Sequence, residues 1–260
     1  MMKKKCLCLL SALLIVFSLA ACGSDTETAD KEKSDFDSFM TVQKNMEQIK
    51  DAEFKVNMET AIPSRDGDYN MTVSGTAKEI KKAKDDIQME MKYKMNMAGT
   101  DMSGTMYMKD KALYTEFMGQ KVKTDTSNEM GAMMKVDTDE LLSITEEMIS
   151  DLKVSRDGED TVYNFTMDPT KAMDYMAKNV SGAEGITDAD GKLTFDKANI
   201  SVTADKNDMA KKIDVDFSLK AKLDEETVAM KFKTTVEFVS INTDLTIDFP
   251  DFEGYQEMTV

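Results

Sequence analysis

Residues 87–97, Ile-Gln-Met-Glu-Met-Lys-Tyr-Lys-Met-Asn-Met, alternate without a break between apolar and polar side chains. Successive side chains on a β-strand point to opposite faces of the sheet. The stretch therefore predicts a long strand with one apolar face and one wet face. The apolar face of this strand carries Ile87, Met89, Met91, Tyr93, Met95 and Met97.

The same alternation recurs on both sides of this strand, with turn residues between the segments, such as those around Gly67, Gly99 and Gly119. Counting the alternating segments predicts about nine to eleven antiparallel strands. The clearest further segments lie at residues 54–58, 69–73, 102–108, 213–223, 228–238 and 245–249.

Three other segments have the spacing of helices. Residues 35–50 place Phe36, Phe39, Met46 and Ile49 on one side. Residues 138–151 form a second candidate helix. Residues 169–179 form a third, because proline is favoured at the first helical position.

These elements favour an α+β fold. We expect one large, curved antiparallel sheet, a half-barrel, with about three helices covering its apolar face. The alternative is two smaller domains divided near residue 130, although no proline-rich linker lies there. We therefore expect a single domain over residues 36–260.

The first residues have the order of a secretory signal peptide. Lys3, Lys4 and Lys5 precede an apolar run over residues 7–19, and Ala20 and Ala21 follow it. The run is shorter than the roughly 20 residues that a membrane-spanning helix needs.

The segment Leu19-Ala20-Ala21-Cys22 resembles the lipobox of bacterial lipoproteins. That resemblance implies cleavage after residue 21, lipid on Cys22, and attachment to the outer side of the cell membrane, as a diacylglycerol- and palmitate-bearing cysteine would provide. The alternatives are an uncleaved membrane anchor and a secreted protein with a chance cysteine. We expect residues 1–21 to be the signal peptide and residues 22–35, which are polar, to form a tether.

Composition excludes several functions. The chain has 49 acidic and 33 basic residues, a net charge of −16, which disfavours binding to nucleic acid. Histidine is absent, and with it the commonest general base and transition-metal ligand. The acidic pairs around Asp205 and Asp188 lack the full spacing of a calcium loop and favour turns. We expect no catalysis, no cofactor and no metal site.

The lipobox, the polar tether, the alternating strands and the closing segment Val236-Glu-Phe238 to Asp248-Phe-Pro250 resemble a group of Gram-positive lipoproteins without an assigned activity. The stretch Tyr107-Met-Lys-Asp-Lys-Ala-Leu-Tyr114 is similar to a hairpin that recurs in that group. The group in turn is similar to the LolA-like and LppX/LprG lipoprotein-carrier superfamily. That resemblance implies a half-barrel that holds acyl chains between its sheet and helices.

Methionine is unusually frequent, with 24 residues, and many fall on the predicted apolar face. They could fill an ordinary core, line a deformable cavity for lipid tails, or bind Cu(I) through thioethers, although the methionines alternate within strands rather than cluster in loops. The candidate ligand-binding residues are Met58, Met71, Met89, Met91, Tyr93, Met95, Met97, Met106, Phe217 and Phe232.

Two functions follow from these patterns. The first is a membrane-anchored lipoprotein that binds or carries an acyl lipid or another apolar ligand. The second is a non-catalytic lipoprotein of the cell envelope that has a filled core and binds a protein partner. A cavity between sheet and helices would discriminate them.

Overall fold

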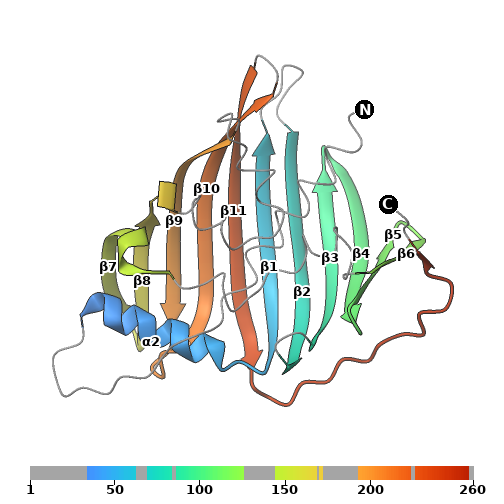
Figure 1. Ribbon diagram of the computed structural model, residues 1–260, viewed down its shortest axis with the longest axis horizontal. Helices are drawn as coiled ribbons and strands as arrows, with labels where there is room; N and C mark the ends of the chain where they lie inside the picture. The colour runs from blue at the N-terminus through green and yellow to red at the C-terminus, as the bar shows by residue number, and fades with distance from the viewer. Residues whose placement is uncertain are drawn as a thin grey trace.

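The computed structural model describes residues 34–62, 69–83, 86–125, 144–168, 170–171, 193–223 and 226–257. These residues form one long helix, a short 3-10 turn and twelve strands (Figure 1). In chain order the elements are α2 (Asp35–Glu47), β1 (Asp51–Ile62), β2 (Tyr69–Ala83), β3 (Asp86–Met97), β4 (Thr100–Lys109), β5 (Ala112–Phe117), β6 (Gln120–Asp125), η2 (Glu146–Met148), β7 (Ile149–Asp157), β8 (Asp160–Met167), β9 (Leu193–Ala204), β10 (Ala210–Leu223), β11 (Glu226–Ile241) and β12 (Gln256–Glu257).

All twelve strands belong to one sheet, in the order β12-β6-β5-β4-β3-β2-β1-β11-β10-β9-β8-β7. Two meanders, β1 to β6 and β7 to β11, join where β1 pairs with β11 at the centre. Every pairing is antiparallel except that of β12 with β6. The prediction of a large antiparallel sheet is confirmed, and the sheet has one strand more than expected.

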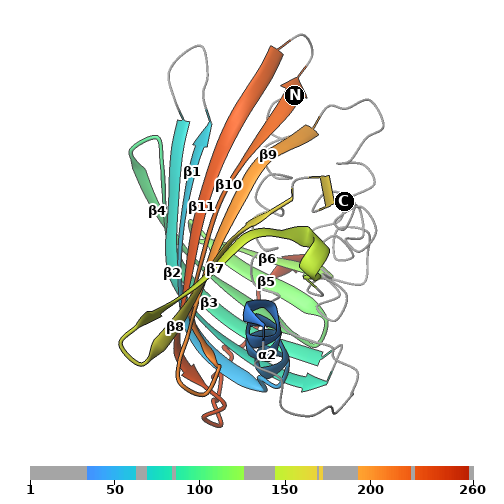
Figure 2. The ribbon, with the colours of Figure 1, turned by 90° about the vertical axis from the view of Figure 1, so that its left-hand side faces the viewer.

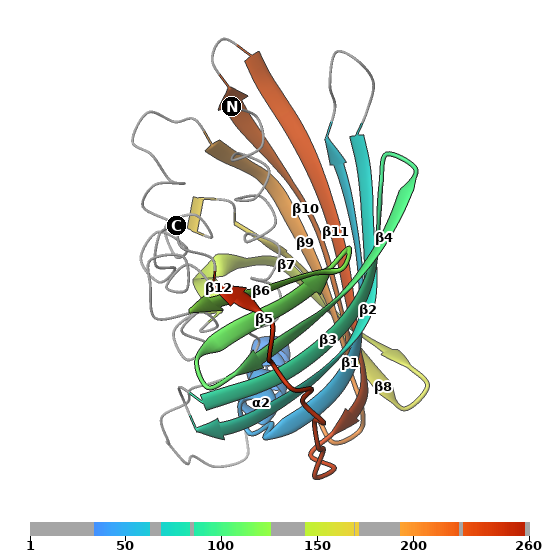
Figure 3. The same cartoon turned by 90° about the vertical axis from the view of Figure 1, so that its right-hand side faces the viewer.

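The sheet is an open trough. Both of its ends curl toward the side that carries α2, and the sheet does not close on itself (Figures 2 and 3). Helix α2 lies inside the trough at one end (Figure 2). We call this side the concave face and the opposite side the outer face.

Helix α2 begins where the sequence predicts, because Ser34 and Asp37 form a capping box. The Ser34 hydroxyl accepts from the Asp37 backbone N–H at 3.1 Å, and the Asp37 carboxylate accepts from the Ser34 backbone N–H at 3.2 Å. Phe39 packs on Tyr163 and Phe165 of β8, with ring centroids 5.6 and 5.0 Å apart. The helix is thereby fixed to the half of the sheet formed by the second meander.

The apolar side chains of the concave face form two groups. The helix cluster surrounds α2. Its buried members are Phe39, Val42, Met46, Ile49, Ala52, Phe54, Val56, Ala77, Met91, Ile144, Tyr163, Phe165, Val202, Ala204, Ala210, Ile213 and Val236. The methionine cluster lies beyond the helix. It consists of buried Met58, Val73, Met95, Leu219, Met230 and Phe232, with Met71, Tyr93, Met102, Phe117, Phe217 and Val228 packed against them.

The second predicted helix, residues 138–151, is wrong where the structure describes it. Residues 146–148 form a single 3-10 turn, and Ile149 begins strand β7. Ile149 and Val154 are β-branched, which favours a strand, and they pair with Met167 and Tyr163 of β8. This strand pairing prevails over the helical spacing of the apolar residues in the segment.

The third predicted helix, residues 169–179, falls mostly outside the described residues. Asp168 does accept a hydrogen bond from the backbone N–H of Lys171 at 3.0 Å, as an N-cap does. The expectation of about three helices is not borne out, because α2 is the one full helix of the described part.

The predicted last strand, residues 245–249, is also wrong. Leu245, Ile247 and Phe249 are half-buried and alternate with exposed neighbours, but they join no strand. The C-terminal segment instead passes beneath the ends of the strands and rises along the edge of β6, where β12 pairs (Figures 1 and 3). An extended chain that packs on a sheet shows the same alternation as a strand within it.

The Asp205 segment is the turn that the sequence predicts. The Asp205 carboxylate accepts from the backbone N–H groups of Asn207 at 2.8 Å and Met209 at 3.0 Å. Among the described residues, no helix has the length and apolar character that crossing a bilayer requires.

Candidate functional site

The ten predicted ligand-binding residues all lie on the concave face of the sheet. Strand pairing places Met58 opposite Val73, Val73 opposite Met95, and Met71 opposite Met97. It also places Met91 opposite Met106 and Phe217 opposite Phe232. Because side chains that face one another across paired strands share a face, alternation alone was enough to select one surface.

The structure divides these residues between the two clusters. Met91 belongs to the helix cluster, Met106 packs against it, and Tyr93 packs against both clusters. Among the contacts of the described residues, Met89 and Met97 belong to neither cluster, and Met97 is 47% exposed. The methionine cluster unites six of them: Met58, Met71, Tyr93, Met95, Phe217 and Phe232.

The methionine cluster is built entirely of strand side chains in the part of the chain that the structure describes. Phe217 and Phe232 stack with their ring centroids 4.7 Å apart and an interplanar angle of 10°. Two threonines are buried beside them: Thr60, opposite Phe232, and Thr234, opposite Met58. Two buried hydroxyl groups therefore lie beside the apolar side chains of this cluster.

A row of glycine and aromatic residues crosses the sheet at the edge of this cluster. The row runs Gly75, Tyr93, Gly104, Phe117 over strands β2 to β5. A Cβ atom on Gly104 would lie 2.5 Å from the Tyr93 hydroxyl oxygen, so only glycine leaves room for the ring. Tyr93 continues onto Phe117, with ring centroids 6.4 Å apart and nearly parallel planes.

One ionisable pair lies at the opposite end of the concave face. Glu79 is on β2, opposite Met89 of β3, and its carboxylate is 3.8 Å from the Lys81 ammonium group. Burial raises the pKa of the Glu79 carboxyl, and Lys81 opposes that rise. This charged pair therefore lies away from the methionine cluster.

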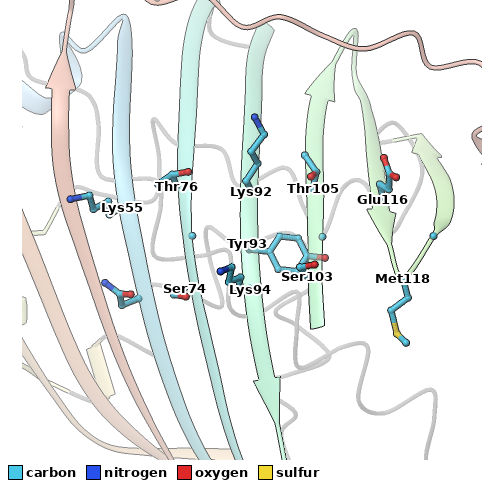
Figure 4. A pocket seen from close by; sticks show the side chains of 14 residues that line it. Lys55, Ser74, Thr76, Lys92, Tyr93, Lys94, Ser103, Thr105, Glu116 and Met118 are labelled. Carbon is cyan, nitrogen blue, oxygen red and sulfur yellow. The ribbon is translucent and has the colours of Figure 1, made fainter. Parts of the chain in front are cut away.

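A groove of about 780 Å³ lies on the outer face over strands β1 to β5 (Figure 4). Lys55, Thr76, Lys92, Thr105 and Glu116 form one row of its lining (Figure 4). The second row contains Asn57, Ser74, Lys94, Ser103 and Met118, and the backbone of the glycine row lies between the two.

The groove is basic and polar. Lys92 pairs with Glu90 at 2.8 Å, and this hydrogen bond raises the pKa of Lys92. Lys55 and Lys94 are exposed and form no ion pair with any residue that the structure describes. A second groove, of about 640 Å³, lies on the outer face over β7 to β11 and has Asp151, Asp214 and Asp216 in its lining. Lysine ammonium groups and hydroxyls could hold an anionic group in the first groove.

No group of three or more Asp, Glu, Cys or His side chains in the described ranges could hold a metal ion. The proposed thioether loop, with Met130, Met133 and Met134, and the lipidation residue Cys22 lie outside those ranges.

A family model described as a family of unknown function (DUF6612) matches residues 37–252. The chain belongs to this family. The match begins within α2 and ends within the C-terminal segment, so it includes strands β1 to β11 and stops before β12. Among proteins with curated descriptions, none matches the sequence significantly.

Solved structures with a similar arrangement include LprF from Mycobacterium bovis, which is 12% identical, with a TM-score of 0.46, over 82% of this chain and 96% of that chain. A DUF1329 family protein from Desulfovibrio piger is 8% identical, with a TM-score of 0.31, over 84% and 96%. A putative outer membrane lipoprotein-sorting protein domain from Vibrio parahaemolyticus is 14% identical, with a TM-score of 0.22, over 75% and 87%.

Three features of this DUF6612 protein were missed by sequence reasoning. The glycine row was visible only as isolated glycines within strands, a signal for close backbone approach. Thr60 is the one polar residue among the alternate residues of β1 that face the concave side. The strand pattern in the sequence could have revealed it. The outer groove depends on which strands are neighbours, and no local pattern contains that information.

Proposed function

We propose that this DUF6612 protein is an extracytoplasmic lipoprotein that binds an apolar ligand, an acyl lipid, over the methionine cluster. The observation that carries the proposal is the division of the concave face. Among the described residues, helix α2 packs against the helix cluster, while the methionine cluster is a second apolar group built from strand side chains. Each methylene of an acyl chain that leaves water there gains about 0.8 kcal/mol.

The side chains of the cluster suit a ligand of variable shape. Met58, Met71, Met95 and Met230 are unbranched, so they can adjust to the position of an acyl chain without strain. The stacked pair Phe217 and Phe232 is a rigid wall beside them. Holding a lipid requires no covalent step, so the proposed role is binding or transport without catalysis.

Native mass spectrometry tests this proposal. The domain from residue 24 onward would be purified from its own cells without detergent, and its bound lipid extracted. We expect one lipid per protein, and we expect delipidated protein to take up a lipid from vesicles. A ligand-free mass that does not change after incubation with envelope lipids would exclude lipid binding.

Lipid attachment at Cys22 is the second part of the proposal. It rests on the lipobox, the short apolar run and the polar tether in the sequence. Cys22→Ala should leave the precursor uncleaved and without lipid, whereas the mature wild-type protein should carry the added mass of the diacylglycerol modification. Cleavage that proceeds normally in the variant, with no lipid in the wild type, would show an ordinary secreted protein.

A protein-interaction role is the alternative, and the outer groove is the observation that favours it. Lys55 and Lys94 form a basic site on a protein with a net charge of −16, so an acidic partner could bind there. Cross-linking on intact cells, with Lys55→Glu and Lys94→Glu as the disrupting variants, would detect such a partner. Capture of the same partner by wild type and variants would exclude the groove as the binding site for that partner.

A further inference from the structure

Thr60 of β1 has a buried hydroxyl group with no partner. The residue is 3% exposed, and its hydroxyl oxygen has no hydrogen-bond partner among the residues that the structure describes. A buried hydroxyl without a hydrogen bond is destabilising, and most buried side-chain polar groups in native proteins are satisfied. A threonine hydroxyl without a partner among the described residues is suited to form a hydrogen bond with a bound ligand.

Thr60 lies at the edge of the methionine cluster. Strand pairing places Thr60 opposite Met71 on one side and opposite Phe232 on the other. Beyond Phe232 the same row continues to Phe217, and beyond Met71 it continues to Met97. The unpaired hydroxyl is therefore the one polar group within a row of large apolar side chains.

The charge of the site restricts the group that Thr60 can bind. No member of the methionine cluster is charged, and the Glu79–Lys81 pair lies at the other end of the concave face. An ionised carboxylate or phosphate buried here without a counter-ion would be strongly disfavoured. Since the described residues of the cluster offer no counter-ion, a neutral hydrogen-bond acceptor that is attached to an apolar chain suits the site best.

We propose that the Thr60 hydroxyl donates a hydrogen bond to the carbonyl oxygen of an ester-linked acyl chain, so that the ligand is a neutral acylglycerol-type lipid and not a free fatty acid. This inference rests on the proposed lipid-binding function and specifies its ligand. The apolar chain would lie over Met58, Met95 and Phe232, and the ester would mark the point where it leaves the cluster.

The test compares two lipids of equal chain length. Dioleoylglycerol carries ester carbonyls, and its ether-linked analogue, dioleylglycerol, lacks them. Binding of each to delipidated protein would be measured by displacement of a fluorescent fatty-acyl probe. We expect wild-type protein to prefer the ester by about five- to tenfold, the effect of one hydrogen bond in a buried site.

The variants separate this hydrogen bond from general packing. Thr60→Val keeps the size of the side chain and removes the hydroxyl, so it should bind both lipids equally, with the affinity for the ether unchanged. Thr60→Ser should retain the preference for the ester. Thr161→Val, at a buried threonine of β8 outside the methionine cluster, is the matched control and should also retain it.

The melting temperature of each ligand-free variant is the second readout. Thr60→Val should melt at the same temperature as wild type or higher, because no hydrogen bond is lost. A clear decrease would reveal an internal partner for the hydroxyl and would overturn the assignment. So would equal binding of ester and ether by the wild type, or a preference that survives in Thr60→Val. If wild-type protein binds neither the probe nor either lipid, the lipid-binding function itself is wrong.

Discussion

Tyr114 of β5 and Phe252 of the C-terminal segment stack with their ring centroids 3.7 Å apart and nearly parallel planes. Phe252 also contacts Tyr107 and Tyr255 edge-on, at 5.8 and 5.6 Å. The ion pair between Lys123 and Glu257, at 2.9 Å, joins β12 to β6. These contacts hold the last residues of the chain along an edge strand whose backbone groups would otherwise be free to pair with another chain.

Phe252→Ala should therefore loosen this edge. We expect the free energy of unfolding to fall by about 1–3 kcal/mol, because a half-buried ring and its aromatic contacts are lost. Amide exchange over residues 120–125 should become faster. Met118→Ala, at a side chain that is 72% exposed, is the control and should change the free energy by less than about 0.5 kcal/mol. Urea denaturation and hydrogen exchange measure both effects, and equal effects of the two variants would contradict the role of Phe252.

A second prediction concerns the glycine row. A Cβ atom on Gly75 would lie 2.5 Å from the backbone carbonyl oxygen of Lys92. On Gly104 the nearest group is the Tyr93 side chain, at 2.5 Å, and the nearest backbone atom, the Glu116 carbonyl oxygen, is farther away at 2.8 Å. Backbone yields less readily than a side chain, so Gly75→Ala should lower the free energy of unfolding more than Gly104→Ala, with about 1–3 kcal/mol for each. Urea denaturation of both variants would show which substitution lowers the free energy of unfolding more. Full recovery of Gly75→Ala on adding Tyr93→Leu would contradict a clash with the backbone.

Some elements of the fold could be predicted from the sequence and others could not. Alternation at residues 87–97 was sufficient to predict a strand and its buried face, because side-chain direction in a strand is a local property. At residues 146–151 the same kind of local pattern predicted a helix, and pairing of Ile149 with Met167 of β8 prevailed. Leu245 and Ile247 alternate as a strand would, but hydrogen-bonded pairing requires a neighbour that the sequence does not reveal.

The candidate site shows the same limit. Apolar parity placed all ten predicted residues on one face, yet it could not separate Met91, which packs near α2, from Met95, which does not. That separation depends on where the helix crosses the sheet. The position of α2 follows from distant contacts, such as the Asn45 side-chain amide donating to the backbone carbonyl of Asp208 at 3.1 Å.

Stability should depend on pH through Glu79. Burial raises the pKa of its carboxyl above the ordinary value of 4.5, so the folded protein binds this proton more tightly than the unfolded chain does. Ionisation of Glu79 therefore opposes folding, and the loss of stability begins as the pH rises above 4.5 and is complete once the raised pKa is passed.

Glu79→Gln should accordingly have a higher free energy of unfolding than wild type at pH 7, and the difference should vanish below pH 4.5. Urea denaturation at several pH values between 4 and 7 measures this. Glu237→Gln, on the outer face, controls for the loss of one negative charge from an acidic protein. A Glu79→Gln variant that is less stable than wild type at pH 7 would show that the Lys81 pair outweighs burial.

Met91 and Met95 offer the sharpest test of what the methionines do. They lie on the same face of β3, with 6% and 7% of their surface exposed, but Met91 packs in the helix cluster and Met95 in the methionine cluster. If both simply fill a core, replacing either by alanine should cost about 2–5 kcal/mol. If the methionine cluster holds a ligand, its side chains are less tightly packed when the ligand is absent.

We therefore expect Met91→Ala to lower the free energy of unfolding of delipidated protein by more than Met95→Ala does. Met95→Ala should instead weaken lipid binding, which Met91→Ala should leave unchanged. Urea denaturation before and after reconstitution with lipid measures both quantities. Equal destabilisation by the two variants, with unchanged lipid uptake in each, would favour a filled core, and the function would then have to be sought on the outer face, at Lys55 and Lys94.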